Sequence, residues 1–126
     1  MQDAPHCRVT TIETPEQLSV LAVEGEISIH TVCPFREALQ RLLDGGARQI
    51  VVDLTRVSFL DSTALGVLVS AQRRLLGRGG SLLVASCEPI AQLLRTVGLD
   101  RLFAMTTSRD ESLVLAAQRA TGTWQG

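Results

Sequence analysis

Short apolar runs alternate along the chain with longer stretches in which apolar residues recur every three or four positions. Two of the runs, QIVVD and SLLVA, are almost uninterrupted, as is typical of strands buried on both faces of a parallel sheet. The first two strands are expected to be joined by a turn around Pro15. The predicted strands are residues 7–11, 18–24, 49–53, 81–85 and 103–106.

Four amphipathic segments separate and follow these strands, because their apolar residues recur with the 3.6-residue period of a helix. Residues that favour helix ends mark their limits: Pro89 in a first turn, a capping box that begins at Ser108, and glycines after the first three helices. The apolar faces of the predicted helices lie within residues 35–43, 65–75, 90–97 and 113–117.

Strands that alternate with helices predict an α/β fold in which a mostly parallel sheet is covered by about four helices. The first strand is expected to be antiparallel to the second, because only a short turn joins them. The 126 residues fit a single domain. Its core is predicted at residues 8–117, with flexible tails at residues 1–6 and 120–126.

Charge and composition exclude several classes of partner. The chain has 12 arginines, no lysine and a net charge of −1, so no basic surface for nucleic acid or for an acidic membrane is expected. It shows no signal peptide and no apolar run long enough to span a membrane, which predicts a cytoplasmic protein. The three cysteines are predicted to be free thiols. Neither histidine has neighbours at metal-ligand spacing, and no metal or cofactor is expected.

Three polar residues, Asp61, Ser62 and Thr63, interrupt the apolar stretch at residues 59–71. They follow the third strand and a predicted loop at residues 54–58, and they open the second helix. Functional sites in open α/β sheets gather beyond the carboxyl ends of the strands. Two interpretations remain open. Either the triplet only caps the helix, or Ser62 accepts a phosphate that free amides and the helix dipole stabilise.

The stretch at residues 51–103 resembles the core of a STAS domain of a bacterial anti-sigma factor antagonist, and the resemblance extends over about residues 8–117. Its most specific part is D-S-T-A-L-G-V-L, with V-D-L before it and G-G-S-L-L-V and V-G-L after it. The resemblance implies that Ser62 is phosphorylated by a partner that is both serine kinase and anti-sigma factor. The unphosphorylated antagonist binds this partner and frees a sigma factor, and a PP2C-type phosphatase resets the switch. ATP then belongs to the kinase, and the chain itself is not an enzyme.

Further residues follow from the same resemblance. The segment from Gly25 to Ser28 is similar to the family's G-E-(apolar)-D segment, but Ser28 stands in place of the aspartate. Thr31 is expected to cap the first helix, and Asp53 to have a structural or partner-binding role. Thr63 is an alternative phosphate acceptor. The residues predicted to bind the partner are Ser28, Thr55, Arg56, Asp61, Ser62, Thr63 and Gly66.

Three other functions are considered. A phospho-aspartate receiver requires a lysine on its last strand, and the chain has none. A serine hydrolase would carry a G-x-S-x-G elbow, whereas the local run is L-D-S-T-A. The remaining alternative is a STAS scaffold, or an accessory subunit of a stress-sensing or transport complex, without a phospho-switch. A large stable assembly would indicate that role, whereas the antagonist is expected to be a monomer or weak dimer.

Overall fold

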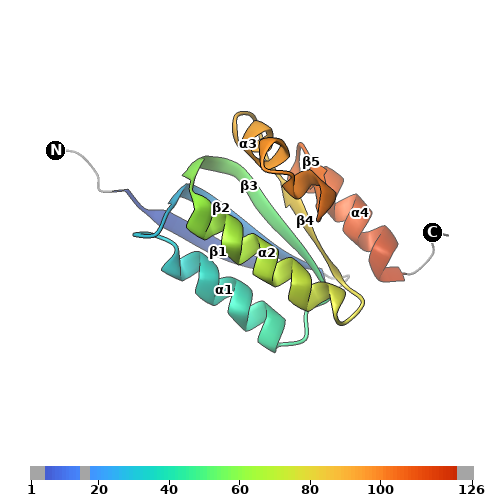
Figure 1. Cartoon of the computed structure of the whole chain (residues 1–126). Helices are drawn as coiled ribbons and strands as arrows, with labels where there is room; N and C mark the ends of the chain where they lie inside the picture. Colours follow the sequence, from blue (N-terminus) through green and yellow to red (C-terminus); the bar gives the residue numbers. More distant parts are fainter. Residues whose placement is uncertain (1–4, 15–17, 122–126) are drawn as a thin grey trace.

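A computed structural model describes residues 5–14 and 18–121 as a five-stranded sheet with helices on both faces (Figure 1). The strand order is β1-β2-β3-β4-β5; β1 is antiparallel to β2, and the other neighbours are parallel. This confirms the predicted sheet, although the turn at Pro15 lies outside the described residues. The strands are β1 (Cys7–Glu13), β2 (Ser19–Ile27), β3 (Gln49–Leu60), β4 (Ser81–Ala85) and β5 (Ala104–Thr106).

The strand order places three helices on one face of the sheet. Each crossover from β2 to β5 moves one strand further in the same direction, and right-handed crossovers then leave their helices on a common face. Figure 1 shows α1 and α2 side by side across the strands. The four predicted helices are confirmed as α1 (Cys33–Asp44), α2 (Ser62–Leu76), α3 (Ile90–Thr96) and α4 (Arg109–Thr121), with a short 3-10 turn at Leu99–Arg101.

The two faces of the sheet carry cores of unequal size. Alternate residues of β3, such as Ile50 and Val52, join the larger core with side chains from α1, α2 and α3. Val51 points the other way, into a smaller core beneath α4. The members of this smaller core are Leu18, Val20, Val51, Leu83 and Ala116.

β3 is longer than predicted, and the expected loop at residues 54–58 is wrong. The strand continues to Leu60 because β2 pairs with it as far as Ile27, with register shifts that follow Ala22 and Gly25. Leu54 and Val57 keep their side chains in the core along this extension. Thr55 is half-buried and Arg56 and Ser58 are exposed, although all three lie within the strand.

Gly25 lies at a register shift of β2 along this extension. It has φ +103°, and a Cβ there would overlap the carbonyl oxygen of His6. That carbonyl accepts a hydrogen bond of 2.8 Å from the backbone N–H of Glu26. His6, which lies in the predicted N-terminal tail, therefore supports the end of β2 that leads into the candidate site.

Candidate functional site

Asp61 directly follows β3 and caps α2. Its backbone is extended, and its Oδ1 accepts hydrogen bonds from the backbone N–H groups of Thr63 and Ala64 at 3.0 and 3.2 Å. A carboxylate in this position is a favourable N-cap and interacts well with the positive end of the helix dipole. Ser62 is thereby placed as the first residue of α2, where it is exposed.

The second oxygen of Asp61 holds the loop between β2 and α1. Oδ2 accepts a hydrogen bond of 3.0 Å from the backbone N–H of Ile29. The Thr31 hydroxyl donates to the Glu26 carbonyl at 2.7 Å and accepts from the N–H of Ser28 at 2.9 Å. The prediction that Thr31 caps α1 is therefore wrong: Val32 takes that position without a side-chain hydrogen bond, and Thr31 fixes the loop instead.

The electrostatic state of Asp61 follows from these contacts. Desolvation raises the pKa of its carboxyl group, whereas the backbone N–H groups of Ile29, Ala64 and Thr63 lower it by more, so the pKa lies below its ordinary value. The group is ionised at neutral pH. Ser62 therefore follows a negatively charged residue in the sequence.

These contacts change the expected surroundings of a phosphate on Ser62. The prediction supposed that free amides of the first turn would stabilise it, but Asp61 already occupies the N–H groups of Thr63 and Ala64. The Ser62 hydroxyl has no hydrogen-bond partner within residues 5–14 and 18–121. A phosphate on Ser62 would thus lie at the surface beside a carboxylate, without those two amides to stabilise it.

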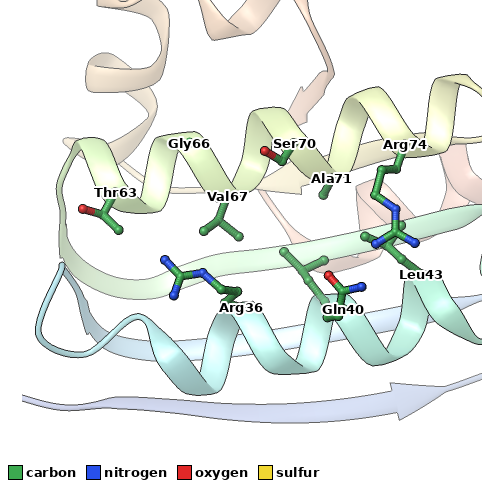
Figure 2. Close-up of a pocket in the computed structure, with 10 residues that line it drawn as sticks. Arg36, Gln40, Leu43, Thr63, Gly66, Val67, Ser70, Ala71 and Arg74 are labelled. Atoms are coloured by element: carbon green, nitrogen blue, oxygen red, sulfur yellow. The ribbon is translucent and has the colours of Figure 1, made fainter.

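A groove of about 420 Å³ extends from this end of α2 between α1 and α2 (Figure 2). Thr63 and Gly66 line it from α2, and Arg36 and Gln40 line it from α1. A Cβ on Gly66 would meet no atom within 4 Å, so the groove is open there. Ala64, the next residue after Thr63, is fully buried in the core and does not line the groove.

The structure separates the predicted partner-binding residues into two groups. Ser28, Asp61, Ser62, Thr63 and Gly66 belong to the first turns of α2 and to the loop that Asp61 holds. The Ser28 hydroxyl accepts a bond of 3.2 Å from the N–H of His30 and lies 3.4 Å from the Thr31 hydroxyl. It is thus engaged within its own loop.

The second group, Thr55 and Arg56, lies on the α4 side of the sheet, away from the groove. Arg56 forms an ion pair of 3.8 Å with Glu24, its neighbour on β2, and Arg8 contacts the same carboxylate at 3.2 Å. Together with Asp53 and Arg109 they line a separate hollow of about 330 Å³. The structure does not bring Arg56 to the Ser62 surface.

Asp53 is engaged by the fold on both oxygens. Oδ1 accepts from the amide and the hydroxyl of Thr55 at 2.9 and 2.6 Å, and Oδ2 accepts from Nε of Arg109 at 2.8 Å. Burial raises the pKa of this carboxyl group, but the bonds from Thr55 and the Arg109 guanidinium outweigh burial and hold it below its ordinary value. Asp53 therefore connects the N-terminal end of α4 to β3, and Thr55 holds the Asp53 carboxylate in place.

Two residues of the site escaped the sequence analysis. Ile29 matters through its backbone N–H, and a backbone contact leaves no trace in residue type. Arg36 is a polar residue of the amphipathic segment that forms α1, and α2 lies close enough for both helices to line one groove. No local pattern reveals such a contact, because it depends on how two helices pack across the sheet.

The described residues also bear on other kinds of site. No three side chains of histidine, cysteine, aspartate or glutamate lie together there in a way that could hold a metal ion. The thiols of Cys7, Cys33 and Cys87 are free. No helix in the described part of the chain is both long and apolar enough to cross a membrane.

Comparison with known proteins identifies the family. The family model described as "Mlab, STAS domain" matches residues 10–107. The anti-sigma-B factor antagonist of Staphylococcus aureus is 31% identical over 90 residues, which are 71% of this chain and 83% of the relative.

Solved structures share the fold of this chain. An anti-sigma factor antagonist from Mycobacterium paratuberculosis has a TM-score of 0.82 and 24% identity, with 87% of this chain and 93% of that chain covered. The phosphorylated form of SpoIIAA, a Bacillus cell fate determinant, has a TM-score of 0.69 and 20% identity, with 86% and 98% covered. The chain belongs to the family of bacterial STAS-domain anti-sigma factor antagonists.

Proposed function

We propose that the unphosphorylated chain binds an anti-sigma factor and so releases a sigma factor, and that phosphorylation of Ser62 ends this binding. The observation that carries the proposal is the position of Ser62, exposed at the start of α2 with an unengaged hydroxyl beside the ionised Asp61. A kinase requires an accessible hydroxyl. Relatives named as anti-sigma factor antagonists support the proposal, and one of them, SpoIIAA, has been solved in both an unphosphorylated and a phosphorylated form.

Phosphorylation requires nothing from this chain except the acceptor oxygen. The Ser62 hydroxyl attacks the γ-phosphorus of ATP held by the anti-sigma factor kinase and loses its proton. ADP is the leaving group. A PP2C-type phosphatase then hydrolyses the phosphoester with water, which restores the hydroxyl and releases inorganic phosphate. The chain is in this scheme a regulatory partner, and no cofactor is assigned to it.

The charge change explains how the switch works without unfolding the protein. A phosphate adds about −1.5 to −2 charges at neutral pH. The N–H groups of Thr63 and Ala64 cannot neutralise it, because Asp61 holds them. The new charge therefore acts on whatever docks at this surface, while the core residue Ala64 and the cap stay in place.

Mass spectrometry on the protein from its own cells, with and without phosphatase treatment, tests the proposal. A single phosphate mapped to Ser62 is expected. In vitro, a cognate kinase should phosphorylate the wild type and Ser58→Ala, an exposed serine nearby, but not Ser62→Ala. Phosphate on Thr63 would reassign the acceptor. No phosphate under any growth condition, with the protein in a large assembly, would favour a scaffold or transport-complex subunit instead.

A further inference from the structure

We propose that the groove between α1 and α2 receives an acidic amphipathic helix of the anti-sigma factor, and that Arg36 is the residue that pairs with its carboxylate. The inference rests on the proposed function and adds the chemistry of the partner's surface. The groove begins at Thr63, next to the phosphate acceptor, so an occupant of the groove reaches the switch. Figure 2 shows Arg36 extending from α1 toward the first turns of α2.

The direction of the switch limits the charge of the partner. Asp61 already makes the start of α2 negative, and a phosphate on Ser62 makes it more so. A partner with a basic surface at this point would bind the phosphorylated form more tightly. Loss of binding on phosphorylation therefore favours a surface that is uncharged or acidic where it meets Ser62.

The charges of the groove favour an acidic partner. Among its lining residues the ionisable side chains are Arg36 and Arg74, and no carboxylate lines it. Arg74 is 3.2 Å from Asp44. Arg36 makes no ion pair or side-chain hydrogen bond within the described residues. It is thus the groove's free positive charge, and it lies at the end nearest to the switch.

The floor and length of the groove suit a helix. Apolar side chains line it along its course, and Gly66 leaves room for a backbone or a side chain to approach closely. The stretch of α2 from Thr63 to Arg74 is about 16 Å long, at about 1.5 Å per residue, which matches roughly three turns of a docked helix. The apolar lining residues are Leu39, Leu43, Val67 and Ala71.

The residue at position 28 is consistent with an acidic partner. The family's aspartate at this position would suit a basic partner, whereas this chain has a hydroxyl that is engaged with His30 and Thr31. Phosphorylation then weakens binding in two ways. The phosphate repels the partner's carboxylate, and it competes with that carboxylate for Arg36.

Titration calorimetry against each anti-sigma factor kinase encoded in the same genome tests the inference. With the unphosphorylated proteins at low salt, Arg36→Glu is expected to raise the Kd about tenfold or more. The matched control is Arg41→Glu, which makes the same charge change on the same helix outside the groove and is expected to stay within about twofold. Added salt screens the charges and should therefore reduce the difference in Kd between wild type and Arg36→Glu.

A second variant tests the groove by shape. Gly66→Leu introduces a side chain into open space of the groove, so it should fold normally and bind about tenfold more weakly or worse. A circular-dichroism melt checks the fold of each variant. Charge reversal of one acidic residue in the partner should weaken its binding to wild type and restore binding to Arg36→Glu, which identifies the pair.

The outcomes separate this inference from the function on which it rests. If Ser62→Ala binds a kinase and Ser62→Glu does not, while Arg36→Glu behaves like Arg41→Glu, the proposed function stands and the groove is not the docking site. If Gly66→Leu folds and binds like wild type, the groove inference is likewise overturned. If Ser62→Ala binds none of the kinases, the proposed function fails, and the groove inference fails with it.

Discussion

Asp53 lies within β3 and Asp61 directly follows this strand, and the two carboxylates have different contacts. Asp53 is 8% exposed in its side chain and is engaged by Thr55 and by Arg109 of α4. Within the described residues, the Asp61 carboxylate accepts hydrogen bonds from backbone N–H groups alone, two in the first turn of α2 and one in the loop between β2 and α1.

The difference shows how one type of side chain serves stability or recognition according to its contacts. The carboxylate of Asp53 connects β3 to α4, so its removal should lower the stability of the fold. The carboxylate of Asp61 shapes a surface and leaves the neighbouring Ser62 hydroxyl unengaged. Changes near Asp61 should therefore be felt mainly in binding, and the following predictions separate the two regions on that basis.

The largest effect on stability is expected for Asp53→Ala. The substitution leaves Arg109 and the Thr55 hydroxyl without their acceptor, and should lower the free energy of unfolding by roughly 2 kcal/mol. Urea unfolding followed by circular dichroism measures it. Asp44→Ala, which removes an exposed ion pair with Arg74, is the control and should change stability by less than about 0.5 kcal/mol. Equal values for the two variants would contradict a stabilising role for Asp53.

Ser62→Glu is expected to change binding without changing stability. The added carboxylate lies at an exposed position, so the urea midpoint should match that of wild type. Affinity for the anti-sigma factor should fall at least about tenfold, which is about 1.4 kcal/mol. Glutamine is similar in size to glutamate but uncharged, so Ser62→Gln separates the effect of charge on binding from the effect of side-chain size. Binding of Ser62→Glu as tight as wild type would rule out a charge-based switch.

Gly66→Ala should make the protein more stable. Gly66 lies inside α2, and its Cβ position is open, so the substitution improves helix propensity by up to about 0.8–1 kcal/mol without a clash. Thermal unfolding measures the gain. A lower melting temperature would show that the space beside Gly66 is needed by the fold itself, which would also weaken its assignment as a docking groove.

The smallest expected effect is a change in how the stability of the protein depends on pH in the acid range. The pKa values of Asp53 and Asp61 are lowered in the folded protein, so their stabilising contributions are present above the unfolded-state pKa near 3.8. These contributions are lost as pH falls from there through the lower folded-state values. Stability of the wild type should therefore decline below about pH 4, and Asp53→Asn should show a shallower decline. An unchanged slope in Asp53→Asn would contradict the lowered pKa of Asp53.

The two regions also differ in how far the sequence could predict them. The pattern around Asp61 is local: a carboxylate three residues before Ala64 and a helical period after it predict a cap and the exposure of Ser62. The pattern around Asp53 suggested a strand end followed by a loop. Its continuation to Leu60 depends on β2, because pairing with another strand decides whether polar residues such as Thr55 lie in a strand.

From the sequence alone come the five strands, the four helices and the position of Ser62, because each depends on residues within a few positions of one another. The mixed sheet was predictable because strands and helices alternate along the chain. Tertiary structure decided which side chains meet. Arg109 reaches Asp53 across 56 residues, and Ile29 reaches Asp61 across 32. Arg36 lines the groove with Gly66 only because α1 and α2 pack on the same face of the sheet. Contacts between distant segments arise from topology and packing, and the local periodicity of the chain carries no record of them.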